Sequence, residues 1–225
     1  MERIYSYIQR FSTNQIQIME KIIHQIWVGD FLIPYREQQL AQQLKELHSD
    51  YEYILWREAP QLPQNIQYWY DRFYSMKNYV FCADLLRIWV VYNFGGFYLD
   101  IDFDIKRRLD PIFEHNSVLF YHNDTDFTIP NNLIGATKGS PLLKHCLDGV
   151  SEYTSWYGPS WFGEVVKNYL GLPYEIPQSP VSEALSQHGF HYHQYWEFEK
   201  TYGKHLSLYS WEPKTWERLN KNEQL

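Results

Sequence analysis

The stretch FGGFYLDIDFD, residues 94–104, decides the fold of this chain and poses its functional question. The apolar FYLDI predicts a strand buried on both faces, and the two glycines before it predict a tight reversal out of a helix. Asp100, Asp102 and Asp104 then follow at alternate positions. On an extended segment they point to one side, where mutual repulsion and lost hydration are costly. A metal ion, a covalent phosphoryl intermediate or simple solvation at a strand end would offset that cost.

The segment before this strand, residues 76–96, is the strongest helix prediction in the chain. Its apolar residues recur near the 3.6-residue period, and Gly95 and Gly96 suit its C-terminal cap. Asp84 and Arg87 are three residues apart on this helix and therefore share a face. Such a pair is often a structural ion pair, but its position shortly before the carboxylates favours a functional site.

Strands and helices alternate outside this block. KIIHQIWVGD (21–30) reads as a buried strand and YEYILW (51–56) as a second short strand, and helices are predicted at 34–47 and 65–74. This alternation predicts an α/β domain with a largely parallel sheet. We expect one domain over 1–225, with a helical leader at 1–20 and a closing segment on the acceptor side at 172–225. Later expected elements are strands at 118–124, 133–136, 190–195 and 204–209, and helices at 141–154, 159–170 and 212–220.

The composition restricts the function classes. The chain has 225 residues, 44% hydrophobic and 21% charged, so it can bury a core. Its formal charge of −7 argues against a nucleic-acid partner, which a basic face would attract. No apolar run reaches the roughly 18–20 residues of a membrane span, and the N-terminus lacks the apolar core of a signal peptide. We therefore expect a cytoplasmic protein with at most peripheral membrane association, in which Cys82 and Cys146 are buried, reduced thiols.

Four interpretations of the carboxylates compete. A calcium-binding EF-hand loop is excluded, because Ile105 stands where it requires glycine and Pro111 where it requires glutamate. A haloacid-dehalogenase-like phosphatase would use Asp100 as nucleophile, but Phe103-Asp104 replaces its usual Gly-Thr. A solvated strand end suits one aspartate better than three. A nucleotide-sugar site, in which a D-x-D pair holds a divalent metal against a diphosphate, agrees best with the Asp and Arg of the preceding helix.

The blocks IIHQIWVG, YEYILW and ADLLRIWVVYNFGGFYLDID together resemble the DXD sugar-binding glycosyltransferases of family 32. That family includes bacterial capsule and lipopolysaccharide transferases and fungal α-1,6-mannosyltransferases, and the clostridial glucosylating toxins are more distant relatives. The similarity is dense over residues 21–105 and resumes in NNLIGATKGSPLL, YGPSWF and HLSLYSW. It implies a GT-A fold, which is a Rossmann-like α/β domain, and a nucleotide-sugar site that uses Mn²⁺ or Mg²⁺.

The resemblance also assigns roles around the nucleotide. It implies that Trp27 stacks on the base and that Tyr98 lies beside the nucleotide. Asp84 and Arg87 match residues that hold the donor sugar and the diphosphate.

In the DXD motif itself, Asp100 matches the carboxylate that contacts ribose and sugar hydroxyls and reaches the metal. Asp102 matches the main metal ligand. Asp104 lies outside the motif, and we expect it to be a solvated partner of Lys106 or Arg107.

Beyond the central block the resemblance is weaker. It implies that Asn131 or Asn132 lies near the donor sugar, without deciding which. Ser210 and Trp211 match a Ser-Trp pair that closes over the diphosphate, with Ser210 as a further candidate metal contact. His205 matches a histidine six residues before that tryptophan and is a candidate metal ligand, although leucine replaces the second histidine that usually follows it.

The resemblance therefore implies a metal-dependent retaining glycosyltransferase that moves a hexose from a nucleotide sugar to a glycan or lipid-linked acceptor in surface polysaccharide synthesis. The Trp27 stack favours a UDP-sugar over a GDP-sugar. We expect front-face attack, because no further carboxylate is identifiable as a nucleophile. Two alternatives stay open: a metal-dependent phosphohydrolase that uses Asp100, and a non-catalytic sugar- or nucleotide-binding module. His24 is expected in the core, and the aromatic residues of HYHQYW (191–196) on the acceptor side.

Overall fold

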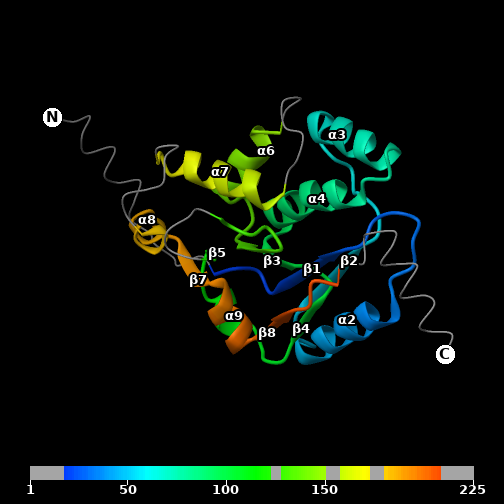
Figure 1. The fold of residues 1–225 in the computed structure, drawn as a ribbon, viewed down its shortest axis with the longest axis horizontal. Helices are drawn as coiled ribbons and strands as arrows, with labels where there is room; N and C mark the ends of the chain where they lie inside the picture. The colour runs from blue at the N-terminus through cyan, green and yellow to red at the C-terminus, as the bar shows by residue number, and fades with distance from the viewer. Residues whose placement is uncertain (1–17, 123–127, 151–157, 173–179, 209–225) are drawn as a thin grey trace.

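The structure, a computed structural model, describes residues 18–122, 128–150, 158–172 and 180–208. These residues form a mixed α/β fold in which a central sheet lies between two layers of helices (Figure 1). Residues 1–17 of the expected leader and the helix expected at 212–220 lie outside the described residues. In the described part of the chain, no helix is both long and apolar enough to cross a membrane.

The central sheet has six strands in the order β2-β1-β3-β6-β5-β7. Neighbouring strands pair in parallel except at β6, which runs antiparallel to both β3 and β5. The largely parallel sheet expected from the sequence is thus confirmed, with one reversed strand. The strands are β1 (Ile22–Ile26), β2 (Glu52–Trp56), β3 (Gly96–Leu99), β5 (Ser117–Tyr121), β6 (Leu133–Ala136) and β7 (His191–Gln194).

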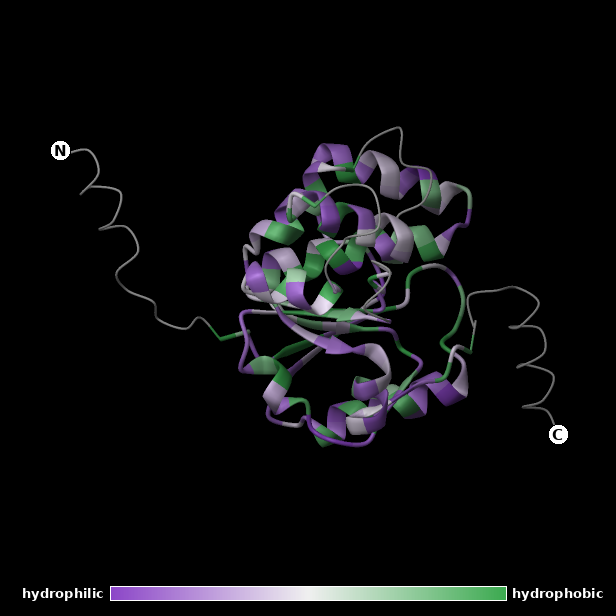
Figure 2. Ribbon diagram, turned by 60° about the vertical axis from the view of Figure 1, so that its left-hand side comes forward, coloured by the Kyte–Doolittle hydropathy of each residue, from purple (hydrophilic) through white to green (hydrophobic). Residues whose placement is uncertain are grey.

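Helices cover both faces of this sheet, and each layer packs its own hydrophobic cluster against the strands (Figure 2). One layer contains α3 (Gln64–Ser75), α4 (Tyr79–Phe94), α6 (Pro141–Asp148), α7 (Pro159–Tyr169) and α8 (Val181–Gln187). The other contains α2 (Tyr35–Leu47), α5 (Asp110–Phe113), α9 (Tyr195–Thr201) and a small antiparallel sheet of β4 (Phe103–Ile105) and β8 (Gly203–His205).

Strand β3 lies in the middle of the molecule, and its side chains alternate between the two clusters. Phe97 and Leu99 pack in one cluster and Tyr98 in the other. None of the three is more than 2% exposed. This confirms a strand buried on both faces, as expected where helices cover both sides of a sheet.

Two glycines make the reversal from α4 into β3. Gly95 and Gly96 have φ angles of +70° and +90°, which favour glycine. A Cβ atom on Gly96 would overlap the carbonyl oxygen of Ile22, and one on Gly95 would overlap the Glu20 carboxylate. The predicted cap is confirmed, because Gly95 closes α4 by donating its N–H to the Val91 carbonyl at 2.8 Å.

The structure differs from the sequence prediction after β3. The segment from Asp100 to Asp102 is a turn rather than an extended chain, and the Phe103 N–H donates to the Asp100 carbonyl at 3.3 Å. The carboxylates therefore converge because the chain turns, not because strand side chains alternate. Helix α6 ends at Asp148, well before residue 154, and α5, α8 and α9 were not predicted because four to seven residues are too few to show a helical period.

Candidate active site

The guanidinium of Arg87 connects helix α4 to Asn131, which precedes β6, and to Asp100, which follows β3. Its Nη1 donates to the main-chain and side-chain oxygens of Asn131 at 3.0 and 3.2 Å. Its Nη2 lies 3.3 Å from a carboxylate oxygen of Asp84 and 3.5 Å from one of Asp100. The guanidinium also lies over the Tyr98 ring, 4.9 Å from its centroid. Asp84 and Arg87 thus share a face that is directed at the first aspartate of the DXD motif.

The charges of this group are shielded from water. Asp84 and Arg87 are only 2% and 6% exposed. Burial raises the pKa of Asp84, although Arg87 opposes that shift. Burial would lower the pKa of Arg87, but Tyr98 and the surrounding carboxylates outweigh it and raise that pKa. Asn131 completes the group by donating its Nδ2 to Asp84 at 2.8 Å, so this buried pair is also satisfied by hydrogen bonds.

Asp100 directly follows β3 and is held by hydrogen bonds to both its side chain and its main chain. The Tyr98 hydroxyl donates to its Oδ1, and the Gln25 side chain donates to its carbonyl at 3.3 Å. Its own N–H donates to the Asn132 carbonyl at 3.0 Å. Burial raises the pKa of Asp100, and the Arg87 charge opposes that shift. The side chain is still 27% exposed, and no donor from the described residues bonds to its Oδ2.

Asp102 lies at the end of the same turn and contacts β8. Nε2 of His205 is 3.0 Å from its Oδ1, and the Leu208 N–H donates to its Oδ2 at 2.9 Å. Burial would raise the pKa of Asp102, but these two contacts outweigh it and lower the pKa. Burial would lower the pKa of His205, but the Asp102 carboxylate outweighs it and raises that pKa. In this arrangement, the carboxylate faces an imidazole that binds its proton more tightly than usual.

The two asparagines before β6 have different surroundings. Asn131 is 2% exposed and bonds Asp84 and Arg87, as described above. Asn132 donates its Nδ2 to the Tyr195 hydroxyl oxygen at 2.9 Å, and the same nitrogen lies 3.5 Å from Nδ1 of His205. Asn131 thus supports the Arg87 group, whereas Asn132 lies beside His205, the residue that contacts Asp102.

One ligand atom from each of Asp100, Asp102 and His205 lies within 4.8 Å of the others, and no other such group of three occurs in the described part of the chain. Carboxylate oxygens suit either Mg²⁺ or Mn²⁺, while an imidazole nitrogen favours the softer Mn²⁺. The Oδ1 atom of Asn132 is buried and has no partner among the described residues, so an unpaired acceptor adjoins this group. The residues present fit a divalent cation.

Trp27, Ser210 and Trp211 are the other residues expected near the nucleotide. Trp27 lies just after β1, and its indole N–H donates to the Phe31 carbonyl at 3.0 Å. It shares the carboxyl edge of the sheet with Asp100, because β1 and β3 run parallel. Ser210 and Trp211 lie outside the described residues.

Four residues have the structural roles expected of them. Asp104 lies in β4, and its carboxylate is 2.6 Å from the Lys106 amine. His24 is fully buried, with its Nε2 bonded to the Gly95 carbonyl at 2.8 Å, and burial lowers its pKa to about 4. Cys82 and Cys146 are free, buried thiols, as predicted.

Three residues of this region were not identified from the sequence. Gln25 is fully buried in a strand that otherwise reads as apolar, which is a usable signal. Tyr195 was included only in the aromatic segment expected on the acceptor side. Leu208 acts through its main-chain amide, which no side-chain pattern reveals.

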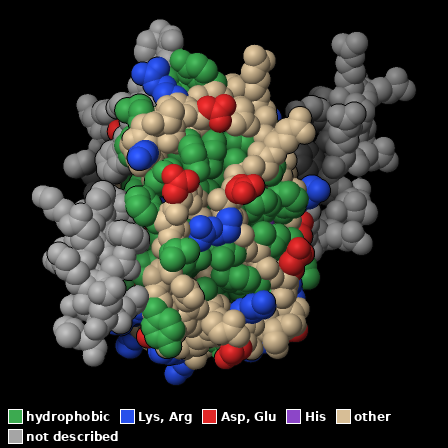
Figure 3. Space-filling view, turned by 90° about the vertical axis from the view of Figure 1, so that its right-hand side faces the viewer, with side chains coloured by type: hydrophobic (Ala, Val, Ile, Leu, Met, Phe, Trp, Pro, Cys, Tyr) green, Lys and Arg blue, Asp and Glu red, His purple; other side chains and the backbone are tan. Residues whose placement is uncertain are grey.

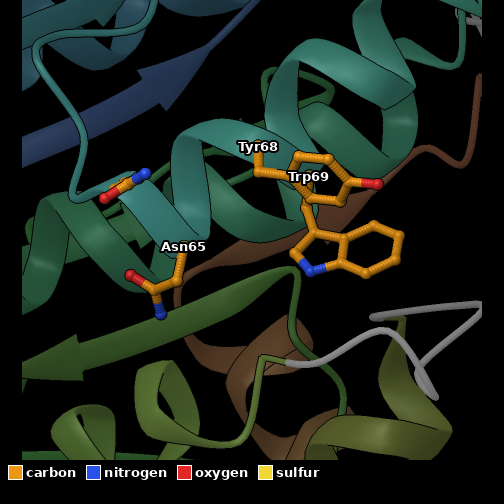
Figure 4. A pocket seen from close by; sticks show the side chains of 4 residues that line it. Asn65, Tyr68 and Trp69 are labelled. Carbon is orange, nitrogen blue, oxygen red and sulfur yellow. The ribbon is translucent and has the colours of Figure 1, made fainter.

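A separate hollow of about 650 Å³ lies on α3 (Figure 4). Its lining residues are Gln64, Asn65, Tyr68 and Trp69. None of them belongs to the polar group around Arg87.

Residues 34–119 match the sequence model of a family described as the glycosyltransferase sugar-binding region containing the DXD motif. The matched region contains Asp84, Arg87 and both DXD aspartates, and it ends before Asn132 and His205. A solved structure, the PaToxG glycosyltransferase, is similar over 83% of this chain and 80% of its own, with a TM-score of 0.56 and 16% identity. The fold is therefore that of the GT-A glycosyltransferases. Residues 34–119 are thus similar to the sugar-binding region of the DXD glycosyltransferases, in agreement with the resemblance seen in the sequence.

Three fungal relatives extend this comparison. Inositol phosphoceramide mannosyltransferase 3 of Schizosaccharomyces pombe is 30% identical over 61% of this chain and 38% of its own length. In Saccharomyces cerevisiae, the mannosyl phosphorylinositol ceramide synthase SUR1 is 25% identical over 85% of this chain and 53% of its own, and CSH1 is 29% identical over 64% and 38%. The chain thus spans about half or less of the length of these relatives.

Proposed function

We propose that this chain is a metal-dependent glycosyltransferase that takes a hexose from a nucleotide sugar. One observation carries the proposal: Asp100, Asp102 and His205 converge beside the buried Arg87. A nucleoside diphosphate leaving group gains negative charge as its bond to the sugar breaks. A site that combines a fixed guanidinium with ligands for a divalent cation is suited to stabilise that charge.

The metal ion we propose is Mn²⁺, because the donor set contains a histidine nitrogen as well as two carboxylates. When bound, a divalent ion supplies Lewis-acid stabilisation of the diphosphate. The chain's own contribution is to hold Asp102 ionised and to orient Asp100 through the Tyr98 hydroxyl. Arg87, whose charge is permanent, positions Asp84 and Asp100.

We further propose retention of the anomeric configuration by front-face attack. The acceptor hydroxyl then enters on the side of the leaving diphosphate, and a diphosphate oxygen takes its proton. In support, Asp84 is buried and engaged by Arg87 and Asn131, which makes it a poor nucleophile. Mass-spectrometric detection of a covalent glycosyl-enzyme during turnover would overturn this route.

The names of the relatives favour mannose as the transferred sugar and an inositol phosphoceramide as the model for the acceptor. We therefore propose a lipid-linked acceptor, which is one of the two acceptor classes expected from the sequence. Figure 3 shows the side of the molecule on which β1 ends, where apolar side chains gather among charges of both signs. Leu32 and Met76 are 78% and 66% exposed, which supports an acceptor with an apolar portion.

A panel of donors tests the proposal. Hydrolysis and transfer should be measured with UDP-glucose, UDP-galactose and GDP-mannose, each with Mn²⁺, with Mg²⁺ and with a chelator. We expect one nucleotide sugar to be consumed only when metal is present, and Asp102→Asn to abolish that consumption. Failure of every donor to bind or react would overturn the proposal. Turnover of a simple phosphomonoester that Asp100→Asn abolishes would favour a phosphohydrolase instead.

A further inference from the structure

Asn132 and Tyr195 form a buried polar pair at the edge of the proposed donor site. Asn132 precedes β6, and Tyr195 begins α9 directly after β7. The Asn132 Nδ2 donates to the Tyr195 hydroxyl oxygen at 2.9 Å. Tyr195 is 8% exposed, so this bond is largely shielded from water.

The hydrogen bonds of the pair are incomplete. Because the Tyr195 oxygen accepts from Asn132, its own O–H is free to donate, and no acceptor for it occurs among the described residues. Burial raises the pKa of Tyr195, so the hydroxyl keeps its proton. On the other residue, the buried Oδ1 of Asn132 lacks a donor within the same described ranges. One unused donor and one unused acceptor therefore lie side by side, which is costly unless a ligand satisfies them.

The pair adjoins the groups that would hold the nucleotide sugar. The Asn132 Nδ2 is 3.5 Å from Nδ1 of His205, and the opposite ring nitrogen of His205 is 3.0 Å from Asp102. The main chain of Asn132 also accepts the N–H of Asp100 at 3.0 Å. The pair is thus fixed relative to both DXD carboxylates.

We propose that Tyr195 and Asn132 together recognise one hydroxyl group of the transferred sugar, which makes Tyr195 a specificity-determining residue. A sugar hydroxyl can donate to Asn132 Oδ1 and accept from the Tyr195 O–H, so one group satisfies both vacancies. This inference rests on the proposed function, since it presupposes a sugar donor. Tyr195 lies outside residues 34–119, so the family match does not assign it a role.

The test compares Tyr195→Phe with Tyr202→Phe. Tyr202 follows α9, is 9% exposed and packs in the same hydrophobic cluster as Tyr195, so it controls for the loss of a buried tyrosine hydroxyl. Affinities should be measured for GDP-mannose against GDP and for UDP-glucose against UDP, in Mn²⁺. We expect Tyr195→Phe to weaken the binding of the nucleotide sugar about 10- to 100-fold and to leave the nucleoside diphosphate unchanged. Tyr202→Phe should change neither affinity.

Monodeoxy forms of the donor sugar identify the hydroxyl. The wild-type protein should discriminate against one of them, and Tyr195→Phe should lose most of that discrimination. Asn132→Ala, which removes the acceptor, should show the same selective loss and serves if Tyr195→Phe unfolds. Equal weakening of nucleotide sugar and nucleoside diphosphate, or unchanged binding of both, would overturn the inference. If the wild-type protein binds no nucleotide sugar at all, the proposed function itself fails.

Discussion

Nε2 of His205 lies 3.0 Å from the Asp102 carboxylate, although the two residues are 103 positions apart. The register of the small sheet produces this contact, because β4 and β8 pair Phe103 with His205. The imidazole also stacks on the Phe103 ring, with 4.7 Å between the centroids. The second DXD aspartate is therefore oriented by a strand near the end of the described chain.

Asp102→Asn should remove most of the metal-dependent activity. The amide has no charge to bind a cation, and it weakens the contact with His205. We expect kcat/KM with the donor identified by the panel to fall about 100-fold or more, and Mn²⁺ binding by calorimetry to be lost. Asp104→Asn is the matched control, since Asp104 pairs with Lys106, and it should retain near-normal activity. Equal loss in both variants would contradict the division of the three aspartates.

Arg87→Lys should destabilise the fold despite conserving the charge. Lysine lacks the planar donors that reach Asn131, Asp84 and Asp100 together, so buried partners lose their hydrogen bonds. We expect the free energy of unfolding in urea to fall by about 3 kcal/mol. Arg108→Lys is the control, because Arg108 bonds Asp50 and Asp110 near the surface, where solvent screens the ion pairs, and should lower the free energy of unfolding much less. A similar loss for both arginines would argue against a central role for Arg87.

Gly96→Ala should lower the free energy of unfolding by more than its backbone strain alone would. Gly96 and Gly139 both have positive φ angles, of +90° and +77°, but only Gly96 faces a backbone atom where a Cβ would stand. Alanine at position 139 should cost about 1–2 kcal/mol for its backbone conformation. Alanine at position 96 should add a clash with the Ile22 carbonyl, for a total of about 3 kcal/mol or more. Urea denaturation of the two variants checks the difference, and equal costs would contradict it.

His24 should make the protein less stable in acid. Burial lowers its folded-state pKa from 6.5 to about 4, so between these values the unfolded chain binds the extra proton. Neutral His24 makes its full contribution to the free energy of unfolding above pH 6.5. That free energy falls by roughly 3 kcal/mol as the pH drops from 6.5 towards 4. His24→Gln keeps a neutral donor for the Gly95 carbonyl and should flatten the decline of unfolding free energy over that window. An unchanged pH profile would show that other groups control it.

The sequence predicted the central block because its signals are local. The 3.6-residue period, the two glycines and the apolar run fix α4, the reversal and β3 within one short segment. Asp84, Arg87 and Asp100 share this segment, so their meeting follows from helix and strand geometry. The relation of Asp84 and Arg87 to the carboxylates could therefore be anticipated before the fold was known.

The rest of the site depends on contacts between distant segments. No local pattern indicates that β8 returns to β4, or that the turn at Asp100–Asp102 replaces an extended chain. The choice between Asn131 and Asn132 required the partners of each amide. Tyr195 belongs to a helix of only seven residues, too short to show a period, so its hydroxyl could not be placed beside Asn132.

The reversal of β6 has a consequence for transplanting specificity between proteins of this fold. Parallel strands deliver the residues that follow them to the carboxyl edge, whereas an antiparallel strand delivers the residues that precede it. Asn131 and Asn132 reach the site for this reason, and the pairing of Leu99 with Leu133 sets which amide faces which neighbour. A slip of one position in that pairing would exchange the two amides. A chimaera that swaps sugar preference should therefore exchange β3 and β6 as one unit.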